Sequence, residues 1–166
     1  MTLAQRSMAT LFKELIDGPP PEAAYMLNPG DTGLLRSLAS MSAGAASRVP
    51  MSGGATIAAH VDHIVYGLAL LNEWHRGNPD PWSSADWSAS WTRTVVDDAA
   101  WAALRTSLEH ETRAWLEAIQ APREYTATDL NNVMSSIAHL AYHLGAIRQI
   151  DRSLCGPSAT PHTAGG

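Results

Sequence analysis

Apolar residues recur at steps of three and four along most of the chain, the spacing that places side chains on one face of an α-helix. In the first such stretch, Leu11, Phe12, Leu15 and Ile16 follow this rule. Four further stretches do the same, and no run of alternating apolar and polar residues predicts a strand. The predicted helices cover residues 2–17, 31–47, 56–76, 95–119 and 128–150.

Glycine and proline mark the ends of these helices, since neither residue continues a helix well. Gly18 and three prolines close the first helix, and Gly77 and Pro79 close the third. The sequence therefore predicts an all-α fold, a bundle of four main helices with an extra N-terminal helix at 2–17.

The chain has 166 residues, the size of one domain, and its 45% of hydrophobic residues can fill a core. We expect a single domain at 1–152, with the bundle itself at about 31–152. Residues 153–166 are poor in apolar side chains and are expected to form a flexible tail. The tail holds the one cysteine, Cys155, which has no partner for an internal disulfide.

The connection at 78–97 carries three tryptophans, Trp82, Trp87 and Trp91, among serine, aspartate and proline. A solvated loop rarely holds so many large aromatic side chains. We expect this connection to pack over the end of the bundle, and an aromatic wall for a small ligand is the sharper alternative.

Eleven basic and sixteen acidic side chains give a net charge of −5, and no run of lysine or arginine is present. A nucleic-acid partner is not expected, because nucleic acids are bound through clustered positive charge. No stretch reaches the roughly 20 apolar residues of a membrane helix, so no membrane partner is expected. The first 18 residues lack the apolar core of a signal peptide, and the expected location is cytoplasmic.

Four histidines lie on the apolar faces of two predicted helices. His139 and His143 are four residues apart, and His60 and His63 are three apart, so each pair presents two imidazoles on one side of its helix. A lone buried histidine is usually a satisfied core residue. Two such pairs instead favour a divalent metal bound by His139, His143 and one histidine of the other helix. Three imidazoles leave a position for water, which is typical of a catalytic site.

Other catalytic patterns are absent. The chain has no Glu-x-x-His pair of a di-iron bundle, no H-E-x-x-H and no glycine-rich phosphate loop after a strand. Asp62, Tyr142, Arg148 and Gln149 lie near the histidines in sequence and are candidates for acid or base work. Arg148 and Gln149 are better suited to pairing or capping near the helix end.

Three segments carry a resemblance to a known family: TIAAHVDHI at 56–64, VVDDAAWAALRTSL at 95–108 and AHLAYHLGAIRQI at 138–150. The chain resembles the DinB/YfiT-like metalloenzyme superfamily, whose members are four-helix bundles in which three histidines bind a divalent metal. The resemblance implies two ligands from the H-x-x-x-H of the last helix, His139 and His143. It implies a first ligand on the second bundle helix, where the family's usual spacing points to His63 rather than His60.

The resemblance further implies an enzyme acting on a small-molecule substrate, either a hydrolase or a transferase that uses a low-molecular-weight thiol as cosubstrate. Zinc or nickel is the expected metal and iron is the alternative, since imidazole suits all three. A homodimer is expected, as for many bundles. Two interpretations stay open beside the enzyme: a bundle that binds a metal or small molecule without turnover, and a dimeric interaction module whose histidines only pack. The sequence names no catalytic residue.

Overall fold

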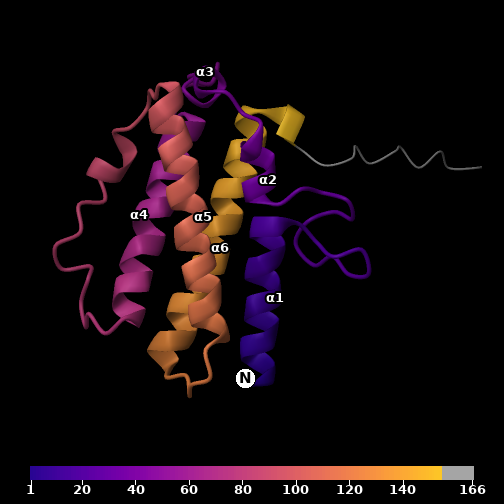
Figure 1. Ribbon diagram of the computed structural model, residues 1–166, viewed down its shortest axis with the longest axis vertical. Coiled ribbons are helices and arrows are strands. Elements are labelled where there is room, and N and C mark those ends of the chain that lie inside the picture. Colours follow the sequence, from indigo (N-terminus) through magenta and orange to yellow (C-terminus); the bar gives the residue numbers. More distant parts are fainter. Residues whose placement is uncertain (155–166) are drawn as a thin grey trace, which may run out of the picture.

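The computed structural model describes residues 1–154, and every regular element in this range is a helix (Figure 1). The long helices are α1 (Leu3–Asp17), α4 (Ile57–His75), α5 (Asp98–Gln120) and α6 (Ala127–Ile150). The short elements are α2 (Leu34–Ala39), α3 (Ala43–Ala46), η1 (Ala89–Trp91) and η2 (Arg152–Leu154). The all-α prediction is confirmed.

The four long helices pack side by side with two directions of travel. In Figure 1, α1 and α6 run upward from the end marked N, whereas α4 and α5 run downward. α1 contacts α5 and α6, and α4 contacts the same two helices from the other side. Because α4 and α5 are parallel, the connection between them has to return along the length of the bundle.

The expected arrangement, four main helices plus an extra N-terminal one, is not confirmed in that form. α1 is itself one of the four long helices, and the single helix predicted at 31–47 is replaced by the short helices α2 and α3. These two cover one end of the bundle (Figure 1).

The break between α2 and α3 has two causes, one within the segment and one in α5. Ser42 caps α3 by accepting a hydrogen bond from a backbone N–H inside it, which competes with a continuous helix. The carbonyls at the end of α2 are used by α5 instead. Arg105 donates to the carbonyl of Ala39, and the indole nitrogen of Trp101 donates to that of Met41 at 2.7 Å. These bonds satisfy groups that a longer helix would pair internally.

The other predicted helices start and end within a few residues of the observed bounds. Their first turns are capped by side chains that accept a backbone N–H: Thr2, Thr56, Asp97 and Thr126. For α6 the cap is Thr126, and Asp129 completes a capping box three residues later.

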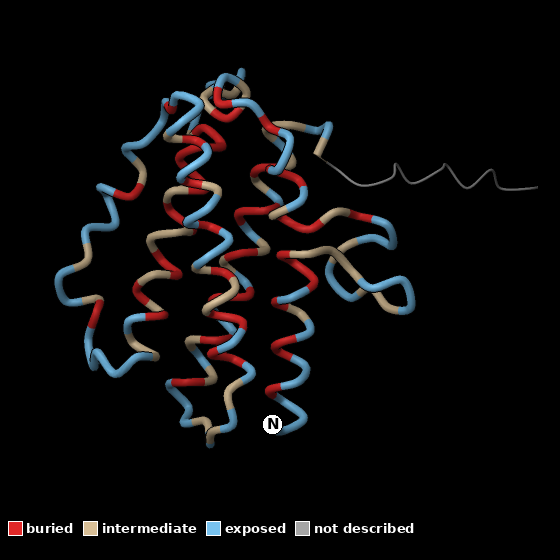
Figure 2. The backbone as a smooth tube through the Cα atoms, viewed as in Figure 1, coloured by how far each residue is buried: buried red, intermediate tan, exposed pale blue. Residues whose placement is uncertain are grey.

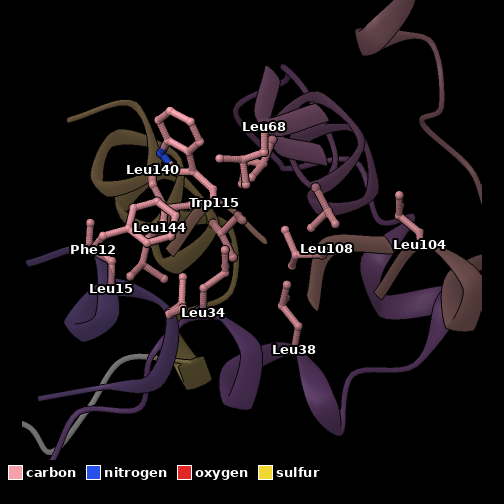
Figure 3. Packing of buried hydrophobic residues seen from close by; sticks show 14 of the residues in the cluster. Phe12, Leu15, Leu34, Leu38, Leu68, Leu104, Leu108, Trp115, Leu140 and Leu144 are labelled. Carbon is pink, nitrogen blue, oxygen red and sulfur yellow. The ribbon is translucent and has the colours of Figure 1, made fainter. Parts of the chain in front are cut away.

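Side chains from α2 and from all four long helices meet in one hydrophobic core (Figure 3). Figure 2 shows the buried positions recurring along the inward sides of the helices. Trp115 of α5 is fully buried at the centre, and its indole nitrogen donates to the Ser136 hydroxyl of α6 at 2.8 Å. The hydrogen bond removes the penalty of burying that polar edge, so the ring fixes α5 against α6.

The connection at 78–97 does not pack over the end of the bundle as expected. It runs along the outer side of α4 (Figure 1), and η1 contacts that helix. The backbone N–H of Asp86 donates to the Tyr66 hydroxyl of α4 at 2.8 Å. The length of the connection follows from the parallel directions of α4 and α5.

Residues 155–166 lie outside the described part of the chain, and with them most of the predicted flexible tail and Cys155. Among residues 1–154, none of the helices combines the length and the apolar character needed to cross a bilayer.

A buried carboxylate holds the segment after α1. Glu14 is 1% exposed, and its carboxylate accepts backbone N–H groups of Tyr25, Met26 and Leu27 at 2.8 to 3.2 Å. Hydrogen bonds to a charged acceptor are stronger than neutral ones. This one side chain therefore ties residues 25–27 to α1.

We expect Glu14→Gln to lower the free energy of unfolding by about 2 kcal/mol, because the amide carries no charge and its NH2 replaces the oxygen that also accepts from the N–H of Tyr25. Urea unfolding followed by circular dichroism measures the change. Glu22→Gln, at an exposed position, is the matched control and should leave stability unchanged. Equal stability of the two variants would show that the carboxylate does not hold this segment.

Candidate metal centre

The four histidines come together where the start of α4 lies beside the second half of α6. His60 and His63 occupy the first two turns of α4, and His139 and His143 face them from α6. Thr56 fixes the start of α4 by capping it and by donating its hydroxyl to the carbonyl of Thr94 at 2.9 Å. The histidines therefore stand on two regular helices whose ends are held.

Three ring nitrogens converge on one point. Nε2 of His139 lies 2.8 Å from Nε2 of His143 and 3.2 Å from Nε2 of His63. The ligating nitrogens of these three residues all lie within 4.8 Å of one another. Two nitrogens bound to one tetrahedral zinc-type ion are separated by about 3.3 Å, so the two shortest spacings are close to those of a metal site.

The donor set fits a divalent transition metal. Imidazole nitrogen is the ligand that zinc, nickel and iron share. Within residues 1–154 no aspartate, glutamate or cysteine joins the three histidines as a fourth ligand. A structural zinc site closes its shell with four protein ligands, whereas three ligands leave a position for water or substrate.

Ser90, in η1, fixes which nitrogen of His63 carries the proton. Its hydroxyl lies 2.8 Å from Nδ1 of His63 and donates its single proton to the carbonyl of Trp87 at 2.7 Å. The hydroxyl must then accept from Nδ1–H of His63. This tautomer leaves the lone pair on Nε2, which faces His139. Ser90 was not predicted from the sequence, because it lies in a connection without fixed spacing to the histidines.

His60 lies beside the cluster of three nitrogens. Its Nδ1 is 2.9 Å from Nδ1 of His143, on the side of that ring remote from His139. With His143 as the donor of this bond, its Nε2 keeps a lone pair toward the other two rings. The structure thus brings all four histidines together, with His63 in the group of possible ligands and His60 behind His143.

Tryptophan rings cover the histidines. Trp91 stacks on His63 with ring centres 4.2 Å apart and meets His60 edge-on at 5.3 Å. Trp87 lies near the same ring, with its ring centre 5.7 Å from that of His63. The aromatic connection therefore supplies an apolar wall beside polar ring nitrogens.

All four imidazoles are neutral at neutral pH. Burial, followed by the neighbouring imidazoles, lowers the pKa of His63 to about 4 and that of His143 to about 3. Burial also lowers the pKa of His60 and His139. A neutral imidazole is the form that binds a metal, so no proton has to be removed from an imidazolium first.

A cavity of about 370 Å³ opens beside the three nitrogens. It lies between α4 and α6 under the tryptophan connection, and two of the possible ligands, His63 and His139, line it. His143 is only 1% exposed and faces the protein interior. A molecule in this cavity would reach the open side of the cluster.

The sequence candidates for acid or base work are placed elsewhere. Asp62 pairs with Arg93 at 3.2 Å, and Arg148 donates to Asp31 and to a backbone carbonyl. Tyr142 is 68% exposed and meets the ring of His143 at its edge. Gln149 is exposed near the end of α6. None of these side chains lines the cavity.

Comparison of the chain with protein-family models, with curated proteins and with solved structures found no match. The resemblance to the DinB/YfiT-like superfamily therefore stays a prediction, as do the metal itself and the homodimer.

The metal-free protein should lose stability as the pH falls from about 6.5 toward 4. In that range the unfolded chain protonates its histidines while the folded state keeps His63 and His143 neutral, so protons favour unfolding. Above about pH 6.5 these groups contribute no pH dependence. Thermal unfolding between pH 7.5 and 4.5 tests this. The double variant His63→Gln, His143→Gln should show a clearly smaller fall in unfolding temperature over this pH range. An equal fall would contradict the lowered pKa of these two histidines.

Ser90→Ala should weaken metal binding about 10- to 100-fold, the usual cost of losing the partner of a ligand histidine. Competition with a chromophoric zinc chelator measures the dissociation constant. Ser88→Ala, an exposed position two residues earlier, is the control. Unchanged affinity in Ser90→Ala would show that the hydroxyl does not set the His63 tautomer.

Proposed function

We propose that this protein is a metal-dependent enzyme that acts on a small molecule, with His63, His139 and His143 holding one divalent ion. The observation that carries the proposal is the convergence of three Nε2 atoms beside a cavity of about 370 Å³. A packing cluster would not need an adjoining cavity, and a structural metal would not need an open side.

A divalent ion on three imidazoles lowers the pKa of a bound water or thiol and supplies a nucleophile near neutral pH. The chain's own residues provide the rest. Ser90 holds His63 in the required tautomer, and a hydrogen bond donated by Nδ1 of His143 to His60 would do the same for His143. Trp87 and Trp91 shield the polar cluster on one side.

The class of reaction is proposed from the resemblance alone. A hydrolase would use water as the nucleophile. A transferase would use a low-molecular-weight thiol, which would lose its proton to solvent and form a carbon–sulfur bond as the bond from that carbon to a leaving group breaks. Zinc or nickel is the proposed ion. A cytoplasmic homodimer is part of the same proposal.

A second candidate is a protein that binds a metal or small molecule without turnover. It is favoured by one observation: no aspartate, glutamate, lysine or arginine of the described chain lines the cavity to act as an acid or base. An enzyme at this site would therefore be restricted to substrates with a good leaving group, which need no acid, whereas a binding protein would have no such restriction.

The first test is the metal content of protein purified without a histidine tag or chelator. We expect about one divalent ion per chain in the parent and none in the double variant His139→Ala, His143→Ala, because one remaining imidazole holds such an ion weakly. Elemental analysis by mass spectrometry measures both. His110→Ala removes an exposed histidine of α5 and should retain the metal. His63→Ala should lose it more completely than His60→Ala.

Circular dichroism shows whether the variants are folded, so that metal loss is not confused with unfolding. A parent that carries no ion, and takes up neither zinc nor nickel when offered, would overturn the proposal in favour of packing histidines. A parent that keeps its ion in the double variant would place the metal elsewhere.

A further inference from the structure

We infer that the cavity beside the histidines takes a neutral, elongated and mainly apolar molecule with one hydrogen-bond acceptor, which Asn132 binds. That this molecule is the substrate rests on the proposed function. That the cavity selects such a molecule rests only on the residues that line it.

The shape of the cavity follows from the antiparallel pairing of α4 and α6. His63 and His139 line one end, and Leu71 and Asn132 line the part that lies further along the two helices. Seven residues separate Asn132 from His139, which is about 10 Å along a helix axis. An occupant that contacts both ends must therefore be longer than it is wide.

The walls of the cavity are apolar and carry no ionic group. Aliphatic side chains come from both helices and two indole rings from the connection. No aspartate, glutamate, lysine or arginine is among the lining residues. A charged group brought between these walls would lose its hydration without gaining a partner. The apolar lining residues are Ile64, Leu68, Leu71, Trp82, Trp87 and Leu140.

One buried side-chain donor among the lining residues lacks a partner. The hydroxyl of Ser136 is used twice, accepting from Trp115 and donating to the carbonyl of Val133. Ser135 donates to the carbonyl of Asn132. The side-chain nitrogen of Asn132 is buried and has no hydrogen-bond partner among the described residues.

An unpaired buried donor destabilises the protein, and a ligand acceptor would remove that cost. The terminal torsion of an asparagine side chain is soft, so the amide can turn toward a ligand within the cavity. A carbonyl or ether oxygen at one end of an apolar molecule meets this requirement.

Gly67 keeps the middle of the cavity open. A β-carbon at this position would lie 3.7 Å from Trp87 and 3.8 Å from His139, which is ordinary contact. A longer side chain would extend into the space between them. Gly67→Leu is therefore a variant that fills the cavity from a helical position, where leucine is also a better helix former than glycine.

The inference is tested on metal-free protein with two probes of matched shape. One is 5-phenylpentan-2-one, a neutral ketone, and the other is 4-phenylbutanoate, in which a negatively charged oxygen replaces the methyl group. Isothermal titration calorimetry should show that the ketone binds at least about tenfold more tightly than the carboxylate. Because no metal is present, the carboxylate cannot gain affinity by coordination.

Variants of the cavity locate the binding. Gly67→Leu should abolish ketone binding. Asn132→Leu should weaken it about tenfold, and the isosteric Asn132→Asp, which replaces the donor by an acceptor, should weaken it at least as much. Asn131→Leu changes the neighbouring, exposed asparagine and should leave binding unchanged.

The outcomes separate this inference from the proposed function. Ketone binding with these variant effects supports the cavity even if elemental analysis finds no metal. The inference is overturned if the carboxylate binds as tightly as the ketone, if neither probe binds, or if Asn131→Leu and Asn132→Leu have equal effects. Metal content decides the proposed function in a separate measurement.

Discussion

The antiparallel contact between α4 and α6 is the interaction on which the candidate site depends. It places two histidine pairs opposite each other, and the same register brings Leu71 opposite Asn132 at the far part of the cavity. Buried imidazoles are costly unless each polar nitrogen has a partner. Here the imidazole nitrogens are within hydrogen-bonding distance of one another, and Ser90 accepts the hydrogen bond from His63. A shift of either helix by one turn would leave several of these nitrogens unpaired at once, so the polar cluster and the helix register stabilise each other.

The parallel directions of α4 and α5 explain why the site is covered by an irregular segment, the connection at 78–97. A chain that leaves the end of one helix and must begin the next at the opposite end needs a long return segment. In this protein the return segment forms part of the site: Trp82 and Trp87 line the cavity, and Ser90 hydrogen-bonds to His63. The rigid helices hold the possible metal ligands, and the return segment supplies the surface that an occupant touches. This division is common among proteins whose loops carry specificity on a fixed scaffold.

Periodicity in the sequence was enough to predict the long helices and the two histidine pairs, since both depend on spacing within one helix. The break between α2 and α3 was not predictable, because it depends on Arg105 and Trp101, more than fifty residues away in the chain. The same limit applies to the choice between His60 and His63. Their spacing is nearly equivalent, and only the position of Ser90 and of α6 distinguishes the ring that joins the group of three from the ring behind it.

The place of α1 between α5 and α6 has a consequence for how this chain is synthesised. The apolar side of α1, with Phe12 and Leu15, is covered by helices that end at residues 120 and 150. At about 5 to 20 residues per second, the ribosome needs on the order of ten seconds to produce them after α1 is complete. During that time α1 lacks α5 and α6, and the apolar side chains that they cover are available to any chaperone that binds nascent chains. This side of α1 can be buried fully only after α6 has been synthesised.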